Sequence, residues 1–236
     1  MDLTEAGSVG GFFALRTDAP DGARGVPLAR LYAGDTAPLT ARVDRVAARL
    51  AAPERRVAAS IAHLGLAARL WSTALGPAVL HGRFPALGPG ELHWDGERSS
   101  PDDLWWSGTA TRPATAADLH EAVVEAHLDP LARAFARDGR VARGLLRGNE
   151  GSALAGAVRE LTRWARREDR PEAARRAWEL ADALFATREL TGTVSGPDRR
   201  RRTCCLYYRC PGGGLCGDCV FDRPPHRGSS ARAASG

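Results

Sequence analysis

The sequence predicts a mainly α (α+β) protein: a helical domain with a small β element around residues 82–113 and a C-terminal cysteine-rich loop. Three observations support this fold class. Apolar residues recur at the three- and four-residue spacing of amphipathic helices through most of the chain. Between residues 82 and 113, short apolar stretches alternate with Gly, Pro and Ser, as in strands joined by turns. All five cysteines lie in the segment 204–219.

The first two helices are predicted from apolar periodicity and from proline. Residues 39–50 (LTARVDRVAARL) place apolar side chains on one helical face. Pro53 suits the first turn of a second helix, which is predicted to run to about Trp71. Gly76-Pro77 is expected to interrupt this helical pattern, because proline removes a backbone donor and crowds the preceding turn.

The β element is predicted from two short stretches rich in aromatic and β-favouring residues. These are ELHWD (91–95) and LWWSGTA (104–110), separated by turn-forming residues. GGFFAL (10–15) is a further candidate for a short strand near the N-terminus.

Helical spacing returns after residue 114. Thr115 is predicted as an N-cap, with Asp118 at the third helical position. Asp129-Pro130 is predicted to begin another helix, Gly148-Asn149 to separate it from the next, and Pro171 to open the last.

The chain is thus expected in three parts. Residues 1–203 form a helical body with the short β excursion, and 192–203 serve as its linker to the cysteines. Residues 204–221 form the cofactor-binding segment, and residues 222–236 form a disordered tail, since they have almost no apolar side chains.

Charge and composition favour a cytoplasmic protein with no nucleic-acid partner and no membrane span. The net charge is +5 and every basic residue is Arg, but Arg is interspersed with Asp and Glu instead of forming a basic stripe. The N-terminus lacks the basic and apolar regions of a secretory signal. The longest apolar stretch, 57–68, is too short for a membrane span.

The five cysteines favour a metal centre, since clustered cysteines in a reducing compartment more often bind metal than form disulfides. A Cys-x-x-Cys pair, Cys216 and Cys219, can serve zinc, an iron–sulfur cluster or a redox pair. The redox pair is disfavoured because no βαβ unit surrounds it. Cys204 and Cys205 are adjacent, which is awkward for one small tetrahedral ion and suits the two iron atoms of a [2Fe–2S] cluster better. Zinc remains an alternative.

The spacing C-C-x10-C-x2-C resembles the FhuF-like ferric siderophore reductase family, as do RRTCCLYYR (201–209) and PGGGLCGDC (211–219). A looser resemblance covers residues 56–71, the tryptophans at 105–106, and GNEGSALAGA (148–157).

The resemblance implies an iron–sulfur loop in which Cys204, Cys205, Cys216 and Cys219 hold a [2Fe–2S] cluster and serve catalysis through it. Cys210 departs from the family pattern. We interpret it as a spare thiol packed near the cluster, with an alternative role as a ligand.

The implied activity is that of a ferric siderophore reductase, an oxidoreductase. One electron would pass to Fe(III) in a ferric siderophore of the hydroxamate type, releasing Fe(II) in the cytoplasm. Hard oxygen ligands hold Fe(III) better than Fe(II), so reduction weakens the complex. No nucleotide-binding motif is present, so a separate electron donor is expected. A zinc-stapled, partner-binding helical protein and an iron–sulfur sensor are the alternatives.

The sequence suggests roles for two further groups of residues. The run Arg199–Arg202 is expected either to tune the cluster potential or to form a solvated patch. His63 is expected in the core, and Trp94, Trp105 and Trp106 are expected in core packing ahead of siderophore binding.

Overall fold

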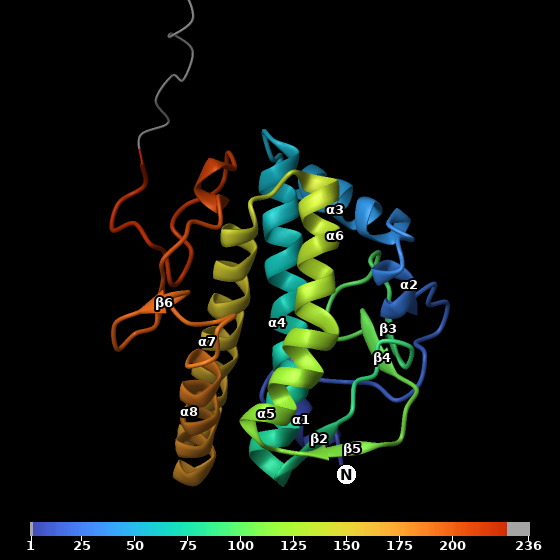
Figure 1. Cartoon of the computed structure of the whole chain (residues 1–236), viewed down its shortest axis with the longest axis vertical. Coiled ribbons are helices and arrows are strands. Elements are labelled where there is room, and N and C mark those ends of the chain that lie inside the picture. Colours follow the sequence, from blue (N-terminus) through green and yellow to red (C-terminus); the bar gives the residue numbers. More distant parts are fainter. Residues whose placement is uncertain (1, 226–236) are drawn as a thin grey trace, which may run out of the picture.

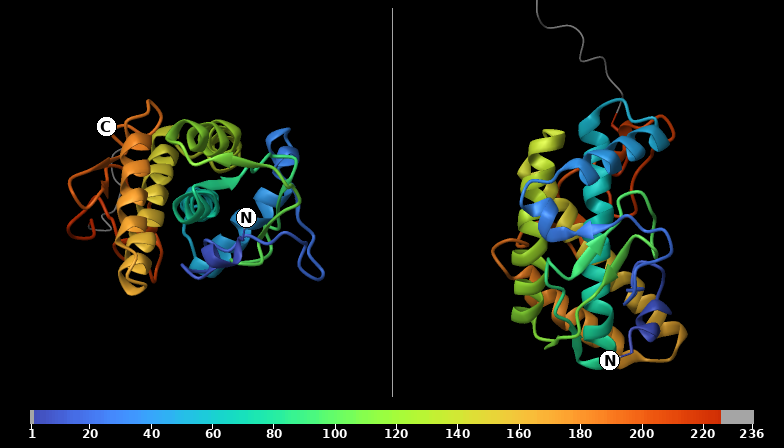
Figure 2. Two further views of the ribbon diagram at one scale, coloured as in Figure 1. Left: turned by 90° about the horizontal axis from the view of Figure 1, so that it is seen from below. Right: turned by 90° about the vertical axis from the view of Figure 1, so that its right-hand side faces the viewer.

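The computed structural model describes residues 2–225, and of residues 138 and 139 only the backbone. It has the predicted mainly α fold, with a long central helix between a helical layer and a layer of small sheets (Figure 1). Seen along the helices, α4 lies at the centre, with α7 and α8 on one side and the N-terminal segments and sheets on the other (Figure 2). The predicted disordered tail lies outside the described residues from residue 226 onward.

The helices follow the chain in a simple order. The two short N-terminal ones are α1 (Thr4–Gly7) and α2 (Leu28–Tyr32). The long ones are α3 (Ala37–Leu50), α4 (Arg55–His81), α6 (Asp129–Gly139), α7 (Arg143–Arg167) and α8 (Pro171–Phe185). The helical stretches predicted at 39–50 and after Pro171 are therefore confirmed.

Helix α4 continues through Gly76-Pro77, so the predicted interruption is wrong. Pro77 cannot donate a hydrogen bond to the preceding turn, but the second half of α4 is buried on nearly all sides. Gly76 lies against the ring of Phe13, where an added Cβ would come within 3.0 Å of the ring. Packing of neighbouring segments around α4 therefore outweighs the local effect of proline.

Residues 116–139 form one uninterrupted helical stretch, so Asp129-Pro130 does not start a separate helix. It begins as α5 (Ala116–Leu119), continues as a π-helix (His120–Leu128) and joins α6 directly. The predicted N-cap is present, because Asp118 N donates to Thr115 Oγ1 at 3.0 Å. The wider turns of the π-helix come just before Pro130 and relieve the crowding that its ring would cause in an α-helix.

Gly148-Asn149 does not separate two helices either, because α7 already begins at Arg143. The apolar stripe predicted downstream of it is buried: Ala153, Leu154, Val158, Leu161 and Trp164. That stripe packs α7 against α4 and α8 within the core.

The predicted β element is confirmed as two small antiparallel sheets. One has the order β1–β3–β4 and the other pairs β2 with β5. Their strands are β1 (Val26–Pro27), β2 (Arg83–Pro85), β3 (Leu92–Trp94), β4 (Leu104–Trp106) and β5 (Thr111–Pro113). Trp94, Trp105 and Trp106 are buried, as core packing requires.

The GGFFAL stretch is not a strand but a series of turns held by a buried arginine. Arg69 on α4 donates to Asp103 Oδ1 at 2.9 Å and to the backbone oxygens of Gly11 and Ala14 at 3.1 and 2.9 Å. One guanidinium thus ties both the N-terminal segment and the β element to the central helix. Its five donors in a planar fork suit it to several acceptors at once.

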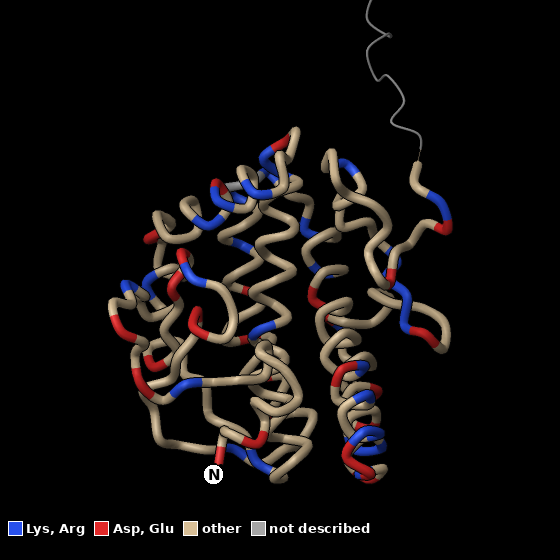
Figure 3. The backbone as a smooth tube through the Cα atoms, turned by 180° about the vertical axis from the view of Figure 1, so that it is seen from behind, with Lys and Arg blue, Asp and Glu red and all other residues tan. Residues whose placement is uncertain are grey.

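The surface mixes positive and negative side chains, as the composition predicted. Figure 3 shows Arg alternating with Asp and Glu along the backbone, including over α8. Within residues 2–225, no helix is both long and apolar enough to cross a bilayer.

Candidate metal centre

The cysteine segment follows a hairpin made of β6 (Val194–Ser195) and β7 (Arg200–Arg201). Residues 192–203 are therefore an ordered hairpin, not the open linker that the sequence suggested. Arg201 in this hairpin is only 1% exposed. After the hairpin, the cysteine segment turns through a short 3-10 helix (Tyr207–Arg209) and lies beside the N-terminal halves of α4 and α7 (Figure 1).

Two glycines of α7 let this C-terminal region lie directly on the helix. A Cβ on Gly148 would come within 1.8 Å of Thr203 Oγ1, and one on Gly151 within 2.1 Å of Thr193 Oγ1. A Cβ at either position would force the facing threonine to move, so glycine permits this close approach. This close approach accounts for the glycines in GNEGSALAGA, which the sequence linked to the family without giving them a role.

A buried polar chain connects α4 and α7 to the first cysteine pair. Ser60 Oγ on α4 donates to the backbone oxygen of Cys205 at 2.9 Å. Asn149 Nδ2 on α7 donates to the backbone oxygen of Ser60 at 2.9 Å. Arg201 Nη2 donates to Asn149 Oδ1, and Arg201 Nε donates to the backbone oxygen of Thr203 at 2.6 Å. The helical body thus holds the backbone of Cys205 directly and the side chain of Arg201, which in turn holds the backbone of Thr203.

The second cysteine pair is held by different contacts. Ser152 Oγ on α7 donates to Asp218 Oδ2 at 2.6 Å, and Arg201 N donates to the backbone oxygen of Asp218 at 3.2 Å. Arg200 Nε donates to the backbone oxygen of Cys219 at 3.0 Å. The hairpin and α7 therefore support the Cys-x-x-Cys turn together.

The four cysteines predicted as ligands divide into buried and accessible members. Cys205 and Cys219 are buried, while Cys204 and Cys216 are half-buried, and no cysteine forms a disulfide. Leu206 N donates to Cys204 Sγ at 3.3 Å. Leu206 has a positive φ of 70°, an uncommon conformation for leucine, and this conformation directs its N–H at the sulfur.

The thiol pKa values reflect how close these sulfur atoms lie to one another. A hydrogen bond from Cys205 lowers the pKa of Cys204 to about 7. A hydrogen bond to Cys205, together with burial, raises the pKa of Cys216. The charge of Cys219 also acts on Cys204. These effects link Cys204 with Cys205 and Cys219, and Cys205 with Cys216.

Cys210 is buried near this centre, at 1% exposure. Its backbone closes a tight turn, since Cys210 N donates to the oxygen of Tyr207 at 3.0 Å and Gly213 N to the oxygen of Cys210 at 2.9 Å. A Cβ on Gly213 would come within 2.1 Å of the oxygen of Tyr207, so this turn requires glycine. The role of the Cys210 thiol stays a prediction.

The residues present fit an anionic cofactor with sulfur ligands. Arg201 Nη1 and Thr203 Oγ1 are buried polar atoms with no hydrogen-bond partner, and both belong to the segment that leads into Cys204. Unsatisfied buried donors are rare in folded proteins and mark places where a further acceptor belongs. Across residues 2–225, no three His, Cys, Asp or Glu side chains converge as ligands of a single metal ion.

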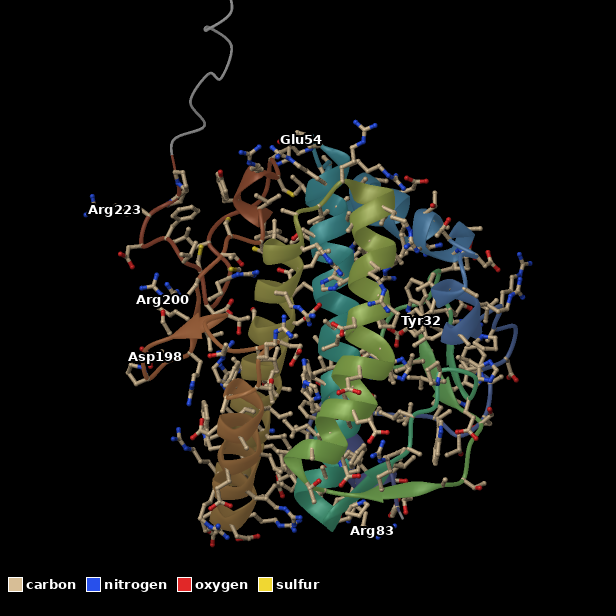
Figure 4. The ribbon with its side chains drawn as sticks, in the orientation of Figure 1. Tyr32, Glu54, Arg83, Asp198, Arg200 and Arg223 are labelled. Carbon is tan, nitrogen blue, oxygen red and sulfur yellow. The ribbon has the colours of Figure 1, made fainter. Side chains whose placement is uncertain are left out.

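A groove of about 410 Å³ opens beside the second cysteine pair. Arg159, Arg200, Asp198 and Asp222 give it charged walls, and Leu215 is an exposed apolar side chain at its edge. Figure 4 shows Arg200 and Asp198 on the hairpin, at the outer side of the C-terminal region. Cys216 and Cys219 also line this groove, so a ligand in it would lie next to the metal centre.

Sequence reasoning found the cysteines but missed the residues that hold them. Ser60, Asn149 and Ser152 support the segment from two helices far away in the chain. The only signal for them in the sequence was the loose family resemblance of residues 56–71 and 148–157.

Comparison with known proteins agrees with the predicted centre. Residues 201–221 match the family described as the FhuF 2Fe-2S C-terminal domain. No curated protein matches the chain. The C-terminal region is therefore an FhuF-type domain, and its cofactor is a [2Fe–2S] cluster.

Proposed function

We propose that this chain is a ferric siderophore reductase whose cluster is bound by Cys204, Cys205, Cys216 and Cys219. A bound [2Fe–2S] cluster supplies one electron at a time, which is what reduction of Fe(III) to Fe(II) requires. The matched domain supports an iron–sulfur protein associated with siderophores. The reductase activity is our extension of that match.

The groove beside Cys216 and Cys219 is the observation that carries the proposal. Electron transfer to a chelate that stays outside the protein needs a cluster near the surface. Cys216 is half-buried and lines the open groove together with Cys219, whereas Cys205 is buried. This arrangement gives a substrate access to one side of the centre while the helical body covers the other.

The substrate that we propose is a ferric siderophore of the hydroxamate type. Its hard oxygen donors bind Fe(III) tightly and Fe(II) weakly, so a single electron loosens the complex. The groove walls combine Arg159 and Arg200 with Asp198 and Asp222. These side chains offer both donors and acceptors to the carbonyl and amide groups of such a chelate.

The electron would come from a separate donor, and the reaction would take place in the cytoplasm. The chain carries no glycine-rich nucleotide-binding motif at the start of a helix. Reoxidation of the cluster by one ferric chelate would be followed by reduction by this donor.

The experiment is anaerobic purification followed by absorption spectroscopy and stopped-flow mixing. We expect a coloured protein whose visible absorption is bleached by dithionite. We also expect the reduced protein to reoxidise faster with a ferric hydroxamate siderophore than with buffer, with Fe(II) trapped by a ferrous chelator. A colourless protein with stoichiometric zinc would instead support the zinc-stapled alternative. A redox-active cluster that ferric siderophores do not reoxidise would support a sensor.

A further inference from the structure

Arg201 differs from the three arginines beside it. The run Arg199–Arg202 is exposed or half-buried except at Arg201, which is 1% exposed. Arg199 and Arg200 form ion pairs with carboxylates, and Arg202 points to solvent. A neighbouring carboxylate or water therefore compensates the charge of Arg199, Arg200 and Arg202. Among the described residues, Arg201 has neither.

The hydrogen bonds of Arg201 do not neutralise its charge. Its acceptors are the amide oxygen of Asn149 and the backbone oxygen of Thr203, both of which are neutral. Within residues 2–225, no carboxylate forms an ion pair with it, and its Nη1 is buried without any partner. A buried guanidinium normally has a negative group beside it, because transfer of an unpaired charge out of water is strongly unfavourable.

Arg201 contacts the chain beside the first cysteine pair, where its Nε donates to the backbone oxygen of Thr203 at 2.6 Å, next to Cys204. Its backbone N also donates to the oxygen of Asp218 at 3.2 Å, between Cys216 and Cys219. One buried cation thus lies beside both halves of the cysteine motif.

We infer that Arg201 is the buried counter-charge of the cluster and that its unpartnered Nη1 donates a hydrogen bond to the cluster or its thiolates. A four-thiolate [2Fe–2S] centre carries a charge of −2 when oxidised and −3 when reduced. A fixed buried cation therefore stabilises the reduced form more and raises the potential. The inference depends on the four-cysteine assignment of the proposed function but not on reductase activity.

The inference is tested by measuring the midpoint potential of the holoprotein in an anaerobic redox titration, without siderophore. Arg201→Gln removes the charge, and we expect the reduction equilibrium to shift toward the oxidised form by roughly tenfold, or about 59 mV for one electron. Arg201→Lys keeps the charge and should restore most of the shift. Arg202→Gln is the matched control, because it removes the neighbouring exposed charge, and it should leave the potential unchanged.

Asn149→Ala separates the electrostatic role from a purely structural one. It removes the acceptor that positions Arg201 but leaves the buried charge in place. We expect it to reduce cluster retention more than it changes the potential. Equal potentials in Arg201→Gln and Arg202→Gln would overturn the inference and leave Arg201 as a structural support only.

A test on the unaltered protein covers the case in which Arg201→Gln fails to fold. Arginine labelled with ¹⁵N in its guanidinium group would be incorporated, and the reduced cluster examined by pulsed electron paramagnetic resonance. We expect a coupling from a guanidinium nitrogen, which disappears in Arg201→Lys. Absence of any such coupling in the labelled parent protein would contradict the hydrogen bond. Because no siderophore is used, failure here leaves the reductase proposal standing, and failure of the reductase assay leaves this inference standing.

Discussion

Ser60 on α4 donates a hydrogen bond of 2.9 Å to the backbone oxygen of Cys205, across 145 positions of the chain. Both groups are buried, so water cannot replace the donor when it is lost. This contact joins the central helix to the backbone of the first cysteine pair. The helical body therefore acts as the rigid support of the cluster loop.

We predict that Ser60→Ala loosens the loop and shortens the lifetime of the cluster. Leaving a buried carbonyl without its donor typically costs about 1–3 kcal/mol. The urea midpoint of the holoprotein should fall, and cluster loss in air should become faster. Ser195→Ala is the control because Ser195 is exposed on the hairpin. Equal cluster lifetimes in the two variants would show that Ser60 does not hold the loop.

The glycines of α7 give a matched pair of substitutions with opposite signs. Gly148 lies against Thr203, whereas a Cβ on Gly144 would meet nothing within 4 Å. Gly148→Ala should displace the segment before Cys204 and destabilise the protein by about 1–3 kcal/mol. Gly144→Ala should stabilise it by roughly 0.5–1 kcal/mol, since alanine favours the helix. Thermal unfolding and iron content measure both effects. Changes of the same sign and size in Gly148→Ala and Gly144→Ala would contradict the close packing of Gly148 against Thr203.

The sequence was informative where a local pattern decides the structure. Helical periodicity predicted the stretch at 39–50, and the Thr115 N-cap was predicted from the acid three positions later. The same local rules failed at Gly76-Pro77 and Asp129-Pro130, where proline signalled a break and the helix continued. In each case distant segments decided the outcome, because packing around α4 or a run of wider π turns compensated for proline.

In the site, too, local sequence patterns predicted some features, whereas contacts between distant segments determined the others. Cysteine spacing is a local pattern, and it predicted the cofactor that the matched domain carries. The partners of Asn149 lie 89 positions earlier and 52 positions later in the chain, and no spacing rule reaches that far. Arg201 belonged to a run of four similar residues, and only the fold reveals which one is buried.

Glu150 should make stability fall as the pH rises toward neutrality. Burial raises its pKa to about 7, against the opposing effect of Arg147. The folded protein therefore holds a proton that the unfolded chain releases near its ordinary value of 4.5. The stability that the protonated Glu150 gives the fold, relative to the ionised carboxylate, is fully present below about pH 4.5. It is lost as the pH rises through 7. Glu150→Gln should flatten the decline in urea-unfolding free energy over that range, whereas exposed Glu160→Gln should not.

His63 should have the opposite effect on the acid side. Burial lowers its pKa to about 3, and the charge of Arg147 adds to that shift. The unfolded chain takes up a proton below about pH 6.5, but the folded protein does not, so stability falls as the pH drops from 6.5 toward 3. His63→Gln should remove this part of the acid dependence. An unchanged slope of unfolding free energy below pH 6.5 would mean that His63 does not remain neutral in the fold.

The ligand set is tested most directly by replacing each cysteine with serine. We predict that Cys204→Ser, Cys205→Ser, Cys216→Ser and Cys219→Ser each lose or alter the cluster, measured by iron, labile sulfide and the electron paramagnetic resonance of the reduced state. Cys210→Ser should keep the parent spectrum, because the four-cysteine spacing is complete without it. Because Cys210 is buried, we expect Cys210→Ser to lower the free energy of unfolding by roughly 1 kcal/mol or more, since a hydroxyl replaces the packed thiol. A parent-like spectrum in one of the other four variants, together with an altered one in Cys210→Ser, would make Cys210 a ligand and reverse that part of the assignment.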